Sequence, residues 1–294
     1  MLFLRLFFLF AVVLCFSCQK ETTTTEPGVV MGFEAIPSVQ PLAPGILDEA
    51  SGIADSKANS GYIWVEQDSG NPNDLTLLSF TGTLQKTINI KPAVNRDWED
   101  MVVASGPQAG KQYIYIADIG DNSLAASAYY IYRFPEPSAS EDTVYEIDKI
   151  SFTYPDGPHD AEAMLVDNTT RDIYIITKQD ASSRIYKLSY PQNIAGNNTA
   201  VLAGALPFNG VTSAAISPDE KELLVKTYTK LYHWHKTKMQ TIEQALSTSS
   251  TTIGYQLEPQ GEAICFKNDN KGFFTLSERP SIVQSVSLNY YKRK

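Results

Sequence analysis

The sequence predicts an all-β fold, a single β-propeller of five four-stranded blades. One observation is the composition, because 16 Tyr and 13 Phe among 294 residues favour strands. A second is an internal repeat, in which a short polar or small stretch precedes an aliphatic residue five times, at intervals of roughly 50 residues. The third is that each repeat continues with short strands separated by turns rich in Gly, Asn, Asp and Pro. Four strands in a repeat of this length are typical of a propeller blade.

The first segment of the chain, residues 1–18, has the pattern of an export signal. Residues 2–16 are apolar except for Arg5, and this run is shorter than the roughly 20 residues of a membrane span. Small Ser17 stands before Cys18, as in a loose bacterial lipobox. We therefore expect residues 1–18 to be a lipoprotein-type signal peptide, with a lipid on the sulfur of Cys18. An ordinary secretory signal is the alternative.

This signal sets the expected location and domain organisation. Residues 19–28, QKETTTTEPG, are polar and Thr-rich, which is typical of a flexible tether. Residues 29–294 then form the propeller domain. The expected place is the bacterial cell envelope, as a periplasmic or outer-membrane lipoprotein that contacts the membrane through its lipid anchor only. Cys265 has no cysteine left to pair with and is expected to be a buried thiol.

The blades follow one another along the chain with the same internal order. The first strands lie in EASGIA, DWEDMV, DAEAML, TSAAIS and QGEAIC, and the second in GYIWVEQD, QYIYIADI, DIYIITKQ, ELLVKTYT and GFFTLSER. The third lie in DLTLLSF, YYIYRF, SRIYKLS, TKLYHWH and SIVQSVSL. A weaker fourth strand follows in four repeats, in GTLQKTINI, YEIDKISFTY, TAVLAGALPF and TIGYQLEP. The one short helix candidate is KMQTIEQAL.

The fifth repeat has only three strands, so its outer strand must come from elsewhere. We expect VVMGFEAIPSV, residues 29–39, to supply it and so to close the ring without leaving an open edge. Six blades are the alternative, because the long interval between the second and third repeats could hide an extra element.

The net charge of the chain argues against one class of partner, nucleic acids. With 24 Lys+Arg against 33 Asp+Glu, the formal net charge is −9. An acidic chain is poorly suited to bind the phosphate backbone, so we expect no nucleic-acid partner.

The first strand of each blade lines the central channel of a propeller. When the repeats are aligned on Ile53, Met101, Met164, Ile216 and Ile264, the residues two positions earlier are Ser51, Glu99, Glu162, Ala214 and Glu262. The three glutamates should therefore face a common space. Two unit charges about 4 Å apart repel by roughly 4 kcal/mol at an effective dielectric near 20, so such a ring needs protons, basic side chains or a metal ion.

Oxygen ligands without a nearby His or Cys favour Ca²⁺. The predicted metal ligands are Glu99, Glu162 and Glu262, together with Asp118, Asp121 and Asn122 of the DIGDN turn. The alternative is that these residues only make turns and hydrogen bonds between blades.

Four residues are candidates for acid–base chemistry at the channel mouth. Glu99 or Glu162 would be the general base, and His159 and Lys178 are the other catalytic candidates. The expected ligand is a small molecule or a glycan bound at this mouth.

Several of these motifs occur together in known exported proteins. DWED, DIGDN, DAEAM and the pair EAI and SER resemble bacterial exported propellers of the phytase-like group, the "esterase-like activity of phytase" domain, and the related SdiA-regulated propeller family. The resemblance implies a propeller outside the cytoplasm. It leaves open whether the chain is an enzyme. The expectation is a Ca²⁺-dependent hydrolase of phosphate or carboxylic esters, and the alternative is a non-catalytic scaffold that binds a ligand, glycan or protein.

Overall fold

A computed structural model describes residues 32–279 and 285–294. The predicted signal peptide, the lipidated Cys18 and the tether all lie outside the described residues. The strands lie in one compact unit, Gly32–Lys294. Within the described part of the chain, no helix has the length and apolar character needed to cross a membrane.

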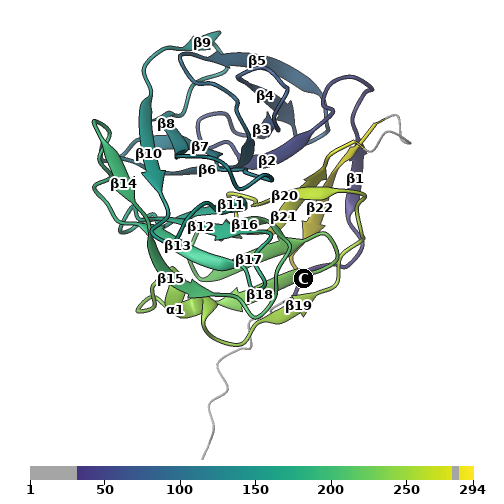
Figure 1. Ribbon diagram of the computed structural model, residues 1–294. Coiled ribbons are helices and arrows are strands. Elements are labelled where there is room, and N and C mark those ends of the chain that lie inside the picture. Colours follow the sequence, from purple (N-terminus) through teal and green to yellow (C-terminus); the bar gives the residue numbers. More distant parts are fainter. Residues whose placement is uncertain (1–31, 280–284) are drawn as a thin grey trace, which may run out of the picture. The chain divides into compact units, whose positions relative to one another are not determined.

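Five antiparallel blades are arranged in a ring about one central axis, as predicted (Figure 1). Blade 1 contains β2 (Ala50–Asp55), β3 (Tyr62–Gln67), β4 (Asp74–Ser79) and β5 (Leu84–Ile90). Blade 2 contains β6 (Trp98–Ser105), β7 (Gln112–Asp118), β8 (Tyr129–Pro135) and β10 (Asp148–Thr153). Blade 3 contains β11 (Ala161–Val166), β12 (Ile173–Thr177), β13 (Arg184–Leu188) and β15 (Val201–Ala205).

Blades 4 and 5 complete the ring. Blade 4 contains β16 (Val211–Ile216), β17 (Glu222–Thr227), β18 (Leu231–His235) and β19 (Thr251–Ile253). Between β18 and β19 lies α1 (Ile242–Leu246), whose first turn is capped by Thr241 and Gln244. Blade 5 contains β20 (Gly261–Phe266), β21 (Gly272–Ser277), β22 (Ser287–Lys292) and β1 (Ser38–Pro41). The inner strands β2, β6, β11, β16 and β20 contact one another in turn, from β2 round to β20 and back.

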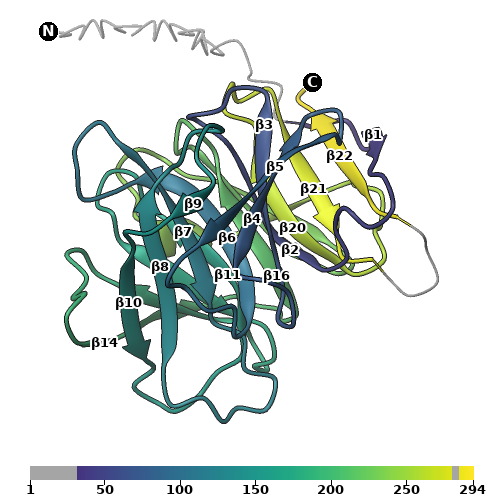
Figure 2. The ribbon, with the colours of Figure 1, turned by 90° about the horizontal axis from the view of Figure 1, so that it is seen from above.

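The two ends of the described unit close blade 5. β1 pairs antiparallel with β22, with Ser38 opposite Tyr290 (Figure 2). Phe33 forms a bridge with Arg293, and the Lys294 N–H donates to the Gly32 carbonyl at 2.9 Å. The prediction that an N-terminal segment supplies the missing outer strand is confirmed. The strand starts near the end of the expected segment and extends to Pro41.

The long second interval contains an added strand rather than a sixth blade. β9 (Thr143–Val144) leaves blade 2 and pairs in parallel with β5 of blade 1. β14 (Asn197–Thr199) likewise leaves blade 3 and pairs in parallel with β10 of blade 2. Each added strand covers an outer edge that would otherwise have free backbone groups. The alternative of six blades is therefore wrong.

A β-bulge interrupts the start of every inner strand. The extra residues are Ser51, Glu99, Glu162, Thr212 and Glu262. The sequence alignment of the fourth repeat is therefore shifted by two residues, because Thr212 rather than Ala214 occupies the position of the three glutamates. Ala214 is instead equivalent to Met101 and Met164. The alternating small and aliphatic residues of TSAAIS allow both alignments, and the strand pairing selects one of them.

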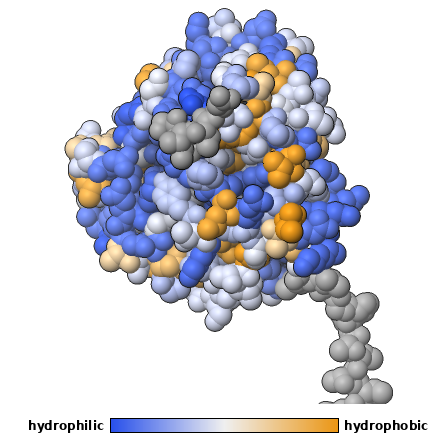
Figure 3. Space-filling view, turned by 90° about the vertical axis from the view of Figure 1, so that its right-hand side faces the viewer, coloured by the Kyte–Doolittle hydropathy of each residue, from blue (hydrophilic) through white to orange (hydrophobic). Residues whose placement is uncertain are grey.

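Among the described residues, the hydrophobic core consists of five clusters, one at each interface between neighbouring blades. Aromatic residues fill these interfaces, as with buried Trp64 and Trp98 between blades 1 and 2. The strands are thus apolar on both faces and polar mainly at their ends. On the side of the molecule shown in Figure 3, hydrophilic residues cover most of the surface and hydrophobic residues form small separate spots. Such scattered exposure is ordinary for a folded domain.

An ionic cluster joins blade 4 to the end of β22. Glu222 Oε2 lies 2.5 Å from Arg293 Nη2, and Glu222 Oε1 lies 3.0 Å from His233 Nε2. Burial alone would raise the pKa of Glu222, but the hydrogen bonds to His233 and Arg293 outweigh it and lower the pKa to about 2.

This lowered pKa predicts how the cluster responds to acid. Its stabilising effect is present above the pKa of about 4.3 that a glutamate has in the unfolded chain, and is lost as the pH falls toward 2. We expect Glu222→Gln to lower the free energy of unfolding at pH 7, and the gap to wild type to shrink between about pH 4 and pH 2. Urea unfolding at several pH values measures both. A gap that stays constant over that range would contradict this role of the carboxylate.

Candidate functional site

Two tiers of polar residues meet at one end of the channel. The inner tier is formed by the five bulge residues Ser51, Glu99, Glu162, Thr212 and Glu262. The outer tier is formed by the polar residues that directly follow the second strand in four of the blades, which are Asp68, Lys178, Tyr228 and Glu278. Blade 2 has the buried, apolar Ile119 at this place. Because the start of each inner strand pairs with the end of the second strand, both tiers lie at the same end.

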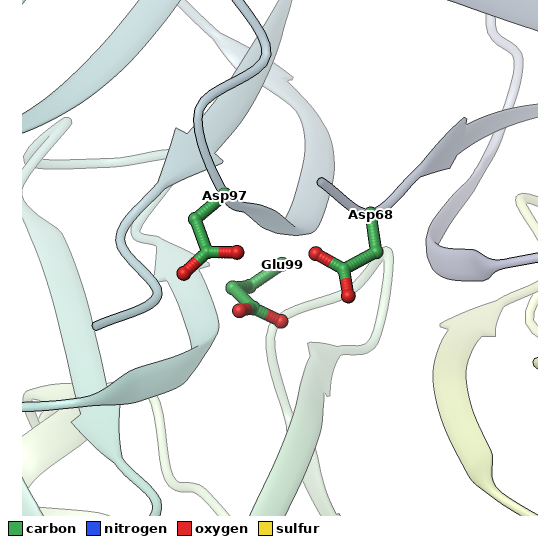
Figure 4. A group of neighbouring side chains, drawn as sticks. All are labelled: Asp68, Asp97 and Glu99. Carbon is green, nitrogen blue, oxygen red and sulfur yellow. The ribbon is translucent and has the colours of Figure 1, made fainter. Parts of the chain in front are cut away.

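Asp68, Asp97 and Glu99 form the first group of converging carboxylates. One oxygen from each lies within 4.8 Å of the others. Figure 4 shows the three side chains pointing toward one another. Asp68 and Asp97 are half-buried, whereas Glu99 is 4% exposed. This group is therefore open to solvent on one side.

Gly120 permits these carboxylates to approach the DIGDN turn. A Cβ atom at this position would overlap the Glu99 Oε1 atom and the carboxyl group of Asp97. Because Gly120 has no side chain, the turn leaves room for the carboxylates of Asp97 and Glu99. The Asp97 N–H in turn donates to Asp118 Oδ1 at 3.0 Å, which fixes the start of the inner strand.

Glu99, Asp160 and Glu162 form the second group, and all three residues are buried. Lys178 Nζ makes a close ion pair with Glu162 Oε1. Across the channel mouth, the Tyr228 hydroxyl donates to Glu262 Oε1 at 2.5 Å. Two oxygens here, Asp160 Oδ2 and Glu262 Oε2, are buried and have no hydrogen-bond partner among the described residues.

The electrostatics of the mouth favour a bound positive charge. Burial, followed by repulsion from Glu162 and Asp68, raises the pKa of Glu99 well above its usual range. Burial and repulsion from Glu262 do the same for Glu162. Burial would lower the pKa of Lys178, but attraction to Glu162 and Glu262 outweighs it and raises this pKa. These raised pKa values show that negative charge is disfavoured at the mouth, and a bound cation would oppose this effect.

The donor set fits a hard cation. Both groups offer carboxylate oxygens only, and an ion such as Ca²⁺ prefers such ligands. The unpartnered oxygens of Asp160 and Glu262 and the glycine cradle at Gly120 are the structural features that agree with a bound ion.

Four of the six predicted metal ligands, Asp118, Asp121, Asn122 and Glu262, do not belong to these two groups. Asp118 pairs with Arg96 at 3.3 Å. Asp121 accepts hydrogen bonds from the N–H groups of Ala125 and Ala126, both at 2.9 Å, and so closes its own turn. Glu99 and Glu162 converge, and Glu262 lies close enough to raise the pKa of Glu162.

Of the other predicted site residues, Asn122 and His159 have partners outside the two carboxylate groups, and Lys178 contacts one of the groups. Asn122 Oδ1 accepts from Gln179 Nε2 at 3.1 Å. His159 Nε2 lies 2.9 Å from the Tyr186 hydroxyl, and its Nδ1 lies 3.2 Å from Asp180 Oδ2. Both nitrogens of His159 thus have protein partners. Lys178 lies within the site, where it neutralises Glu162.

The site predicted from the sequence did not include Asp68, Asp97 or Glu278. Asp68 and Glu278 occupy equivalent places, because their N–H groups donate to the carbonyls of Glu49 and Gln260 before the inner strands. A usable signal was present, since an acidic residue directly follows the second strand in both repeats. Burial and nearby carboxylates raise the pKa of Glu278 to about 7 and that of Asp68 to about 6.

Asp100, the last acidic residue of DWED, has a structural position. Its carboxylate is fully buried and accepts hydrogen bonds from the N–H groups of Met101 and Met164, both at 2.9 Å. It also accepts from the Ser213 hydroxyl at 3.3 Å. Asp100 therefore joins the inner strands of blades 2, 3 and 4 below the carboxylate tiers.

The opposite end of the channel has a different character. A hollow there is lined mainly by small and aliphatic side chains of the inner strands, with Asp55 and Lys57 at its edge. Asp55 accepts a hydrogen bond from the Asn268 N–H at 2.6 Å. Because its polar groups are few and this carboxylate is already partnered, we place the candidate site at the carboxylate end.

No protein-family model and no curated protein matches this chain. Solved structures of similar arrangement include a chain of the nidogen/laminin complex, at 11% identity and a TM-score of 0.46, covering 78% of this chain and 72% of that one. A luciferin-regenerating enzyme aligns at 8% identity and a TM-score of 0.49, covering 87% and 95%. Hydrazine synthase of Kuenenia stuttgartiensis aligns at 11% identity and a TM-score of 0.41, covering 82% and 58%. The propeller fold rests on the five blades themselves.

Proposed function

We propose that this protein is a β-propeller that binds a divalent cation, Ca²⁺ in the first place, at the carboxylate end of its channel. The observation that carries the proposal is the convergence of Asp68, Asp97 and Glu99 within 4.8 Å, next to buried oxygens without hydrogen-bond partners. Such a group is costly without a positive charge. A bound cation would in turn attract an anionic small molecule or glycan to the channel mouth.

Hydrolysis of a phosphate or carboxylic ester is the second candidate function. A bound Ca²⁺ supplies positive charge that polarises a phosphoryl or carbonyl oxygen. Half-buried Glu278, in the outer tier, is a better general base than buried Glu99 or Glu162, because its pKa of about 7 lets it accept a proton at neutral pH. Turnover of a chromogenic ester that stops when Ca²⁺ is chelated separates this function from binding alone.

We further propose that the protein works in the bacterial cell envelope, held by a lipid on Cys18. The support is the apolar segment 2–16 that ends at Ser17 and Cys18. The resemblance of DWED and DAEAM to exported phytase-like propellers agrees with this location and with ester hydrolysis.

Calcium is expected to raise the melting temperature of the wild-type protein. A ligand that binds only the folded state stabilises it by about 2.7 kcal/mol at 100 times its dissociation constant, which is a shift of several degrees for a chain of this length. Glu99→Gln keeps the side-chain shape and removes the carboxylate common to both groups, so it should abolish the shift. Differential scanning calorimetry of protein first dialysed against EDTA measures this.

Glu146→Gln is the matched control, because Glu146 is exposed and lies between the outer strands β9 and β10, in neither carboxylate group. It should respond to calcium as the wild type does. A wild-type melting curve unchanged by millimolar calcium would refute the cation site and leave a scaffold that binds its partner without metal.

A further inference from the structure

We propose that Lys178 is a built-in counter-cation that closes the buried carboxylate group to metal, so that one cation binds, at Asp68, Asp97 and Glu99. Removing the lysine charge should open a second cation position at Glu99, Asp160 and Glu162. The inference rests on the proposed function for cation binding itself. Beyond that function, the inference specifies the position of the ion, the number of ions per chain, and Lys178 as the residue that limits this number.

The two carboxylate groups share Glu99 but differ in charge and exposure. In the first group Asp68 and Asp97 are half-buried and open to solvent, and neither makes an ion pair with a lysine or arginine in residues 32–279 and 285–294. In the second group all three residues are buried, and the Lys178 ammonium contacts Glu162 directly. An incoming cation therefore meets an open, uncompensated group first.

Lys178 is held firmly in this place. Its Nζ lies 5.2 Å from the centre of the Tyr228 ring, and the Tyr228 hydroxyl is tied to Glu262. Its side chain is 18% exposed, so the ammonium is largely withdrawn from water. A dication at the second group would be repelled by this charge at close range and in a poorly screened setting.

The second group and its neighbour Glu262 have carboxylate oxygens without hydrogen-bond partners among the described residues, which is the independent sign of a latent site. Asp160 is 2% exposed, its Oδ1 accepts from the Asp121 N–H, and its Oδ2 has no hydrogen-bond partner in the described part of the chain. Glu262 is 3% exposed, and its Oε2 is likewise unpartnered there. Lys178 pairs with Glu162 Oε1 and leaves these two oxygens without a hydrogen bond. Without its charge, the same oxygens suit a hard cation.

Calorimetric titration with CaCl₂ counts the ions per chain and tests the proposal. For the purified full chain in detergent, after dialysis against EDTA, we expect one Ca²⁺. For Lys178→Met, which keeps an unbranched side chain one atom shorter and removes the charge, we expect two. Lys187→Met is the control, since Lys187 pairs with Asp172 at 2.7 Å in the same blade but outside the channel mouth, and should bind one.

A second variant keeps the test decisive if Lys178→Met folds poorly because Glu162 loses its partner. Lys178→Met combined with Glu162→Gln removes both charges, so it should fold and bind one Ca²⁺ at the first group. Two ions in the wild type, one ion in folded Lys178→Met, or no ion in the double variant would each overturn the role given to Lys178. No ion in the wild type would instead refute the proposed cation site.

Discussion

Asp100→Ala is expected to destabilise the whole domain by on the order of 4 kcal/mol. The carboxylate accepts hydrogen bonds from the Met101 and Met164 N–H groups and from the Ser213 hydroxyl. All three donors lie on inner strands, where water cannot replace the lost acceptor. Each buried donor left without a partner costs about 1–3 kcal/mol. Urea unfolding followed by fluorescence measures the change.

Asp100→Asn is the matched control for this effect. It retains one acceptor oxygen in nearly the same shape, so it should lose clearly less stability than the alanine variant. Asp97→Ala, three residues before in the same motif, changes a half-buried carboxylate and should mainly affect calcium binding. Equal unfolding midpoints for Asp100→Ala and wild type would show that the inner strands do not depend on this residue.

Deletion of residues 1–41 is expected to prevent stable closure of the ring. The deletion removes β1, which is the outer partner of β22, and it removes Phe33, which is 5% exposed. The Phe33 ring lies 4.9 Å from the Phe273 ring at an interplanar angle of 75°, and the Arg293 guanidinium lies 4.7 Å from its centre. Loss of a buried Phe side chain alone costs about 3–5 kcal/mol. Thermal unfolding and hydrogen exchange at β22 measure the effect.

Two further experiments distinguish the loss of ring closure from nonspecific destabilisation by the deletion. Phe33→Ala in the full chain should reproduce much of the destabilisation while keeping β1. A synthetic peptide of residues 32–43, added to the deletion variant, should restore protection of the β22 amides. A deletion variant with the melting temperature of the full chain would mean that blade 5 is stable with three strands.

The fold could be predicted because each blade repeats the same local pattern. Strands such as YIWVEQ and QYIYIAD combine β-branched and aromatic residues between clear turns, so their number and order are visible in the sequence. The added strands β9 and β14 could not be predicted in the same way. NNT in β14 is polar and short, and it is a strand only because β10 of the preceding blade offers a free edge.

The candidate site could be predicted in part, for a similar reason. Equivalence between repeats identified Glu99, Glu162 and Glu262, because bulge residues recur at one place in each blade. Asp97 belongs to the same DWED motif as Glu99, whereas Asp68 follows the second strand of blade 1 and reaches Glu99 only because blades 1 and 2 pack together. Its place after the strand is visible in the sequence, but its closeness to Glu99 is not. Asp121 satisfies its own turn instead of facing the channel, although the sequence DIGDN is compatible with both orientations.

The pairing of β1 with β22 also constrains the order in which the protein folds. Ser38 and Tyr290 are opposite each other yet about 250 residues apart in the chain, so joining them carries a large entropic cost that no nearby contact repays early. Blades 1 to 4 have their four main strands close together in sequence and can form before this step. Until β1 docks, β22 presents an unpaired edge that can pair with another copy. The final docking of β1 is therefore the stage at which this protein is most vulnerable to aggregation.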